Sequence, residues 1–114
     1  MSWSDKYYKD RSVKPEIGTR VQWSGGPGGW VSHFWGTVAR HTKTTVVIDV
    51  AQQRLLSEHG DPTYHEWQYE PIWDVPPARQ ERARFPPVHG SWWAVQNMGI
   101  QEYDGKTGTD VAYY

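Results

Sequence analysis

The 114-residue sequence contains no cysteine. Disulfide bonds, zinc–thiolate sites and thiol catalysis are therefore excluded, because each of them needs a cysteine sulfur. The chain also has little net charge, with twelve Lys and Arg against thirteen Asp and Glu. Proteins that bind nucleic acid without sequence preference draw most of their affinity from neutralised phosphates and are usually basic. This charge balance disfavours such a function.

Long hydrophobic runs are missing as well. No apolar segment approaches the roughly 18 residues that a membrane-spanning helix needs. The first residues, MSWSDKYY, lack the apolar core of a secretory signal. We therefore expect one soluble domain over residues 1–114, without membrane contact and without a cofactor. Its expected location is the cytoplasm, or a virion if the protein comes from a phage.

Tryptophan and tyrosine are abundant, with eight Trp and seven Tyr against two Phe and two Met. These fifteen side chains exceed what the close-packed core of a small domain can hold, so some of them should be exposed. Trp, Tyr and Arg dominate the hot spots of binding interfaces, which favours an interaction surface. The alternative is an aromatic core built with few Leu and Phe side chains.

Hydrophobic alternation predicts several short strands. Over residues 19–24, Val21 and Trp23 alternate with polar residues, as in a half-buried strand. A second strand is expected over 33–40, where Gly36 indicates a bulge or a bend. Residues 44–48 are all β-branched and begin a third strand that ends at residue 50. Further strands are expected over residues 64–69, 91–96 and 109–114.

Helical signals are few and short. Residues 1–16 form an arm or a short helix. Asp49 and Gln52 resemble a capping box, which favours a short helix over 49–60 rather than an extended hairpin edge. Residues 78–84 follow Pro77 and are expected to make two helical turns. Between the first two strands lies the loop Gly25–Gly29, too rich in glycine for a regular element.

Four segments together resemble the SH3-like small β-barrels of the Tudor and KOW type: Gly18-Thr-Arg-Val-Gln-Trp, Trp35-Gly-Thr-Val-Ala-Arg, Thr45-Val-Val-Ile-Asp-Val and Trp73-Asp-Val-Pro-Pro-Ala. The resemblance covers roughly residues 17–79. It implies an all-β fold with one or two short helices, in which a small barrel carries an N-terminal arm (1–16) and a C-terminal extension (80–114). It also implies a binding module, because such barrels seldom do chemistry.

Trp30 follows the glycine-rich loop and is expected to be exposed. Trp92 and Trp93 are adjacent, and adjacent strand residues point to opposite faces, so they cannot both enter one core. The outward one is either exposed or covered by the N-terminal arm or the C-terminal tail. Arg79 and Arg82 share a face if their segment is helical, although a solvated face is the alternative. The candidate partner-binding residues are Trp30, Trp35, Trp92, Trp93, Arg40, Arg79 and Arg82.

A second cluster joins histidines and carboxylates, and it consists of Glu58, His59, Asp61, His65 and Glu66. Such side chains can bind a divalent metal or act as general acid and base. Their spacing matches no common zinc pattern, so a solvated turn is favoured. His59, Asp61 and His65 remain the candidate metal ligands.

We expect a non-catalytic interaction module that binds another protein through exposed Trp, Tyr and Arg side chains. A phage accessory, inhibitory or virion protein fits the small size and the aromatic content. One alternative is nucleic-acid binding by the same barrel, through Arg20, Arg40 and Lys43 with Trp30 and Trp35. Another is a metal-dependent or histidine-based enzyme centred on His59 and His65. A homo-oligomer is compatible with the sequence, because an outward Trp could be covered by a second copy.

Overall fold

The computed structural model describes residues 3–86 and 92–114. Within them, one short helix, α1 (Trp3–Lys9), precedes ten strands. The strands are β1 (Arg20–Gly25), β2 (Trp30–His41), β3 (Val46–Val50), β4 (Gln52–Asp61), β5 (Tyr64–Ile72), β6 (Arg79–Ala83), β7 (Ala94–Val95), β8 (Met98–Gly99), β9 (Gln101–Glu102) and β10 (Gly108–Tyr113). The predicted all-β class with a short helix is confirmed.

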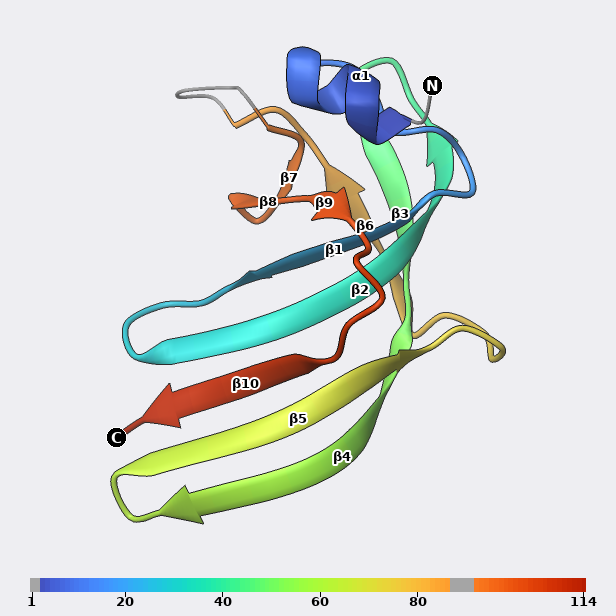
Figure 1. Cartoon of the computed structure of the whole chain (residues 1–114). Coiled ribbons are helices and arrows are strands. Elements are labelled where there is room, and N and C mark those ends of the chain that lie inside the picture. The colour runs from blue at the N-terminus through green and yellow to red at the C-terminus, as the bar shows by residue number, and fades with distance from the viewer. Residues whose placement is uncertain (1–2, 87–91) are drawn as a thin grey trace.

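Strand β2 is the centre of the main sheet (Figure 1). One of its edges pairs with β1. The other edge is divided, because Gly36–His41 pair with β3 whereas Trp30 and Val31 pair with β10. The sheet therefore forks. One branch continues from β3 to β6, and the other runs from β10 through β5 to β4. We call this second branch the wing.

The expected closed barrel is not confirmed. Among the described strands, β4 and β9 end the pairing path and do not meet each other. The wing instead projects away from the core (Figure 1). The radius of gyration is 14.8 Å, whereas a compact domain of this length has about 13 Å. The molecule is thus an open, forked sheet.

Both helices predicted after residue 48 are wrong. The segment 49–60 lies in β3 and β4, and β4 pairs along its whole length with β5, apart from a bulge between Leu55 and Ser57. The segment 78–84 contains β6, which pairs with β3 over five residues. This pairing buries Ala83 in the core. Sheet pairing therefore overrides the local capping signals, as tertiary context commonly does.

The other predicted elements are largely confirmed. The N-terminal residues form the short helix, and strands occupy 19–24, 33–40, 44–50, 64–69 and 109–114 with shifted ends. In the segment 91–96, only Ala94 and Val95 are strand, and Ser91 lies outside the described residues. Gly36 does not form a bulge, because the irregularity of β2 lies between Val38 and Arg40.

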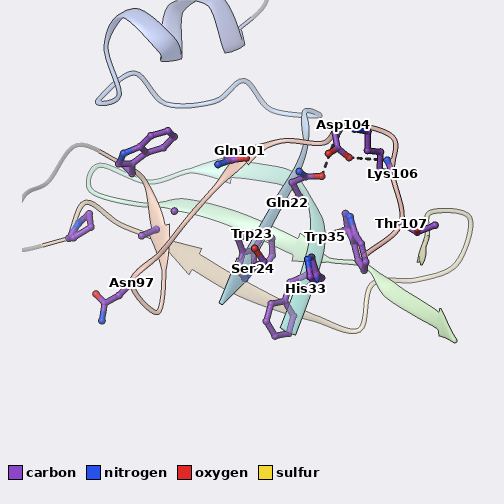
Figure 2. A pocket seen from close by; sticks show the side chains of 15 residues that line it. Gln22, Trp23, Ser24, His33, Trp35, Asn97, Gln101, Asp104, Lys106 and Thr107 are labelled. Carbon is purple, nitrogen blue, oxygen red and sulfur yellow. Dashed lines mark hydrogen bonds between the residues drawn. The ribbon is translucent and has the colours of Figure 1, made fainter. Parts of the chain in front are cut away.

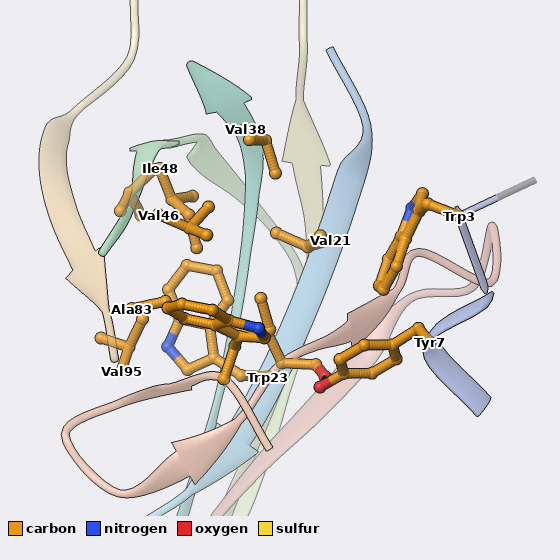
Figure 3. Close-up of a cluster of buried hydrophobic side chains, with 12 residues drawn as sticks. Trp3, Tyr7, Val21, Trp23, Val38, Val46, Ile48, Ala83 and Val95 are labelled. Carbon is orange, nitrogen blue, oxygen red and sulfur yellow. Dashed lines mark hydrogen bonds between the residues drawn. The ribbon is translucent and has the colours of Figure 1, made fainter. Parts of the chain in front are cut away.

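The hydrophobic core lies between α1, the β1–β2–β3–β6 sheet and the β7–β8 hairpin (Figure 3). Helix α1 contributes Trp3 and Tyr7, which pack edge to face at 4.7 Å between ring centroids. The Tyr7 hydroxyl donates to the Ile100 carbonyl at 3.0 Å, which fastens the helix to the segment before β9. The cluster consists of Trp3, Tyr7, Val21, Trp23, Val38, Val46, Ile48, Val50, Ala83, Trp93, Val95 and Ile100.

Gly36 is required for the contact between β2 and β3. A Cβ atom at this position would lie 2.4 Å from Ile48 Cγ2 and 2.8 Å from the Asp49 carbonyl oxygen. Gly36→Ala should therefore cost about 3 kcal/mol of unfolding free energy, as overpacking does in tight cores. The control is Gly28→Ala, where a Cβ meets nothing within 4 Å at a φ of +60° and the cost is about 1 kcal/mol. Equal costs in urea unfolding would contradict the close approach.

Burial raises the pKa of Tyr7 from 10.0 to about 12, against the opposing charge of Arg11. Near pH 8, Tyr7→Phe should cost about 1 kcal/mol, because it removes the hydrogen bond to Ile100. Above pH 10 the unfolded chain loses the phenolic proton of Tyr7 before the folded chain does. The contribution of Tyr7 to the free energy of unfolding, which is complete below pH 10, is therefore lost as the pH rises toward 12. At pH 11, the advantage of the native protein over the variant should fall by about 1 kcal/mol in urea unfolding. A difference independent of pH would refute this.

Candidate functional site

Three segments that are distant in sequence meet at the outer end of the wing: the β1–β2 loop, the β4–β5 turn and the end of β10 (Figure 1). The Tyr113 N–H donates to the Gly29 carbonyl at 3.2 Å, and the Tyr114 N–H donates to the Thr63 carbonyl at 3.0 Å. Backbone hydrogen bonds therefore hold the end of β10 between its two neighbours.

Aromatic and apolar side chains gather at this end, and we call them the aromatic tip: Trp30, Val31, Tyr64, Tyr113 and Tyr114. Trp30 is 47% exposed, Tyr113 60% and Tyr114 66%. Trp30 contacts Tyr114 edge to face at 5.9 Å between centroids, and Tyr64 contacts Tyr113 at 5.0 Å. Trp30 pairs with Ala112 and Tyr64 with Tyr113. Because adjacent strand residues point to opposite faces, the tip covers both faces of the wing's end.

The glycine-rich loop has a structural role at this tip. A Cβ atom at Gly29 would lie 2.9 Å from the Cβ of Tyr113, and one at Gly26 would lie 2.5 Å from the Trp30 carbonyl oxygen. Glycine is therefore needed at both positions for the loop to fold against its own strand and against β10.

The charge around the tip is negative. The segments 25–34, 57–67 and 109–114, which include the loop, turn and strand end that meet here, contain no Lys or Arg. They do contain Glu58, Asp61, Glu66 and Asp110. The pKa of Asp61 is lowered, because its carboxylate accepts hydrogen bonds from the backbone and the hydroxyl of Thr63, each at 2.8 Å. Asp61 is therefore charged at neutral pH.

Among the expected partner-binding tryptophans, only Trp30 is well exposed. Trp35 and Trp93 are buried, with 2% and 4% of their surface exposed, so neither offers a surface to a partner. Trp92 is half-buried, with the Arg11 guanidinium 3.6 Å above its ring centroid and Tyr7 at 5.6 Å. Trp92 also packs against the core cluster that contains Trp93. The prediction that only one of the two can pack on one core is therefore wrong, because neither residue lies in a strand.

The three candidate arginines do not form one patch. Arg79 and Arg82 lie in a strand, where residues three apart point to opposite faces, so the shared helical face does not exist. Arg79 pairs with Glu81 at 3.0 Å. Arg40 in β2 and Arg82 in β6 both pair with Val47 of the strand between them, β3. They therefore flank this buried valine on the face of the sheet that points away from the core cluster.

The three candidate metal ligands, His59, Asp61 and His65, are not brought together. His59 pairs with Glu66, whereas His65 pairs with Gly60, so the two histidines project from opposite faces of the wing. His65 Nε2 lies 2.9 Å from Glu58, and its ring stacks on Trp67 at 4.5 Å. Asp61 is used by the β4–β5 turn. Within residues 3–86 and 92–114, no three His or carboxylate side chains gather in a way that could hold a metal ion.

Sequence reasoning missed a His–Asp pair at the base of the wing. Asp110 Oδ1 lies 3.0 Å from His33 Nδ1 and also accepts the His33 N–H at 2.8 Å. The Gln53 side chain donates to the His33 carbonyl at 2.8 Å. These contacts join β2, β10 and β4 where the sheet forks. The partners are 77 and 20 residues from His33, so no local pattern could indicate them.

Comparison of the chain with protein-family models, with curated proteins and with solved structures finds no significant match. In the described part of the chain, no helix has the length and apolar character needed to cross a membrane.

Asp61 should behave as a turn-capping residue. Asp61→Ala removes the acceptor for Thr63 and for the Tyr64 N–H, which is 3.0 Å away, and should lower the melting temperature. Asp61→Asn keeps a side-chain oxygen at this position and should change the melting temperature less. Both are measured by circular dichroism, with and without added Zn²⁺. A loss of equal size in both variants, or stabilisation of the native protein by Zn²⁺, would contradict the capping role.

Proposed function

We propose that this protein is a non-catalytic interaction module that binds a protein partner through the aromatic tip. The observation that carries the proposal is the clustering of exposed Trp30, Tyr113 and Tyr114 on a backbone fixed by hydrogen bonds. Large aromatic side chains of this kind supply most of the affinity at protein interfaces. A fixed backbone lowers the entropic cost of binding.

The charges near the tip favour a protein partner over nucleic acid. Stacking of bases on Trp30 would bring phosphates toward Glu58, Asp61 and Glu66. No Lys or Arg within residues 25–34, 57–67 and 109–114 would neutralise these phosphates. The complementary surface is apolar with a basic rim. The proposal retains the cytoplasmic or virion-associated location expected from the sequence.

Pairing between the wings of two copies is not the favoured use of this surface. Strand β4 is the outer strand of the wing, and unpaired edges invite pairing with another chain. However, the bulge between Leu55 and Ser57 interrupts the alternation of faces along this edge. A bulge of this kind is one way in which edge strands avoid continuous pairing.

The test is site-specific photo-crosslinking in lysate of the source cells. A photoreactive phenylalanine analogue replaces Tyr113 in one protein and Tyr8 in the control. These two side chains are similarly exposed, at 60% and 66%, and only Tyr113 belongs to the tip. One protein should crosslink from position 113 and not from position 8. This crosslink should persist after nuclease treatment and be lost in a Trp30→Ala background.

Ile17→Ala is the matched control for Trp30→Ala, because Ile17 is an exposed apolar residue outside the tip. It should leave the crosslink intact. Crosslinks that depend on nucleic acid would move the nucleic-acid alternative to first place. The absence of a crosslinked protein at position 113 would refute the proposal.

A further inference from the structure

A cleft of about 490 Å³ lies beside β1 and the loop that leads into β10, and it is separate from the aromatic tip (Figure 2). Binding sites for small molecules commonly have volumes of about 300–1,000 Å³. In Figure 2, Asn97 lies at one end and Thr107 at the other, with Gln101 and Gln22 between them. The cleft is therefore elongated.

Uncharged polar side chains line this cleft. They include the amides of Gln22, Asn97 and Gln101 and the hydroxyl of Ser24. The Gln22 oxygen accepts a weak hydrogen bond from the Asp104 N–H at 3.3 Å. The Gln22 side chain also hydrogen-bonds the Asp104 carboxylate. The side chains of Asn97 and Gln101 are exposed and make no hydrogen bond to another described residue. Each amide can both donate and accept hydrogen bonds.

The backbone positions Asn97 for this role. Gln96 and Asn97 form the two-residue turn of the β7–β8 hairpin and have φ angles of +50° and +68°. Such turns require positive φ at both central residues, and asparagine tolerates this conformation whereas glutamine rarely adopts it. The turn thus places the Asn97 side chain at the end of the cleft.

The charges in the lining cancel. Asp104 and Lys106 are its acidic and basic side chains, and the Asp104 carboxylate accepts the Lys106 backbone N–H at 2.9 Å. His33 also lines the cleft, and its Nδ1 lies 3.0 Å from the Asp110 carboxylate. A phosphate-bearing ligand would meet one ammonium group next to a carboxylate, and a cationic ligand would meet one carboxylate already hydrogen-bonded. The lining therefore suits a neutral ligand.

Two half-buried aromatic side chains, Phe34 and Trp92, add apolar surface to the cleft. Trp23 stacks on Phe34 at 5.8 Å, and Arg11 covers one face of Trp92, so both rings are held in place by neighbours. Phe34 pairs with Trp23 on the core face of β1, whereas Gln22 pairs with Trp35 and Gln101 on the opposite face. The cleft therefore reaches both faces at the edge of β1, and it offers apolar packing on one and amide hydrogen bonds on the other.

We propose that this cleft binds a neutral oligosaccharide. Each sugar hydroxyl donates and accepts hydrogen bonds, as the side-chain amides of Gln22, Asn97 and Gln101 do. The C–H faces of sugar rings match the apolar rings of Phe34 and Trp92. An elongated cleft suits several linked sugar units rather than one. This site does not depend on the aromatic tip.

The experiment is NMR titration of the ¹⁵N-labelled full chain with cellotetraose, maltotetraose and N-acetylchitotetraose, each up to about 10 mM, so that millimolar binding is detected. Asn97 is the single asparagine of the sequence, so its side-chain amide signals are readily assigned. At least one of the three saccharides should shift these signals and those of Gln22 and Gln101. Inorganic phosphate and an uncharged tetra-alanine peptide, capped at both ends, serve as comparison probes.

A double variant tests whether the amides make the contacts. Asn97→Gly keeps the positive φ of the turn, because glycine adopts it freely, and Gln101→Ala changes an exposed side chain of β9. Together they should weaken saccharide binding about tenfold, as the loss of two hydrogen bonds does. Gln52→Ala, an exposed glutamine on the wing, and Trp30→Ala should leave binding unchanged.

Three results would overturn the proposal: no shift with any of the three saccharides, equal or larger shifts with phosphate or with the peptide, or unchanged affinity in the double variant. The folded state of the double variant is checked by its remaining backbone amide signals, so a loss of binding through unfolding is recognised.

Discussion

Strand β2 serves two branches of one sheet, and the close packing at Gly36 makes this possible. Strand β3 approaches β2 over a position that has no side chain, with Ile48 and the Asp49 carbonyl against it. The chain then leaves β2 at Ala51, whose N–H donates to the Trp35 carbonyl at 2.8 Å. From there it continues as β4. This departure frees the first residues of β2 to pair with β10, and the position of the whole wing follows from it.

The strands of the core were predictable because their signal is local. Val21 and Trp23 alternate with polar residues, and both are buried as this pattern requires. The two wrongly predicted helices lie where residues typical of a helix end make contacts between strands instead. Asp49 resembles a helix cap, but its carboxylate accepts a hydrogen bond from Gln80 on the neighbouring strand at 2.8 Å. No pattern within residues 49–60 contains the information that β5 and β6 pair with this segment. The expected pairing of Arg79 and Arg82 on one face failed for the same reason.

The candidate site was predictable only in part. The position of Trp30 after a glycine-rich loop indicated its exposure. The adjacency of Trp92 and Trp93 was misleading, because it indicates opposite faces only in a strand and β7 begins at Ala94. Neither pattern indicates that Tyr64 contacts Tyr113, 49 residues further along the chain. This contact depends on the register between β5 and β10, which no local pattern contains. In the same way, Arg11 covers Trp92 through tertiary packing alone. The grouping of three amides in the cleft is visible only once β8, β9 and the loop before β10 are placed beside β1.

The place of β10 between β2 and β5 also has a consequence for the order of folding. The β4–β5 hairpin forms from neighbouring residues and closes over a two-residue turn at Pro62 and Thr63. The hairpin has no ladder of its own to β2, because β10 fills the space between them. Residues 108–113 must therefore be available before the wing can be joined to the core. Contacts between such distant segments slow folding, because long loops are closed before the contacts form. Until that moment the hairpin exposes two strand edges instead of one, so the partly folded chain is the form most prone to aggregate.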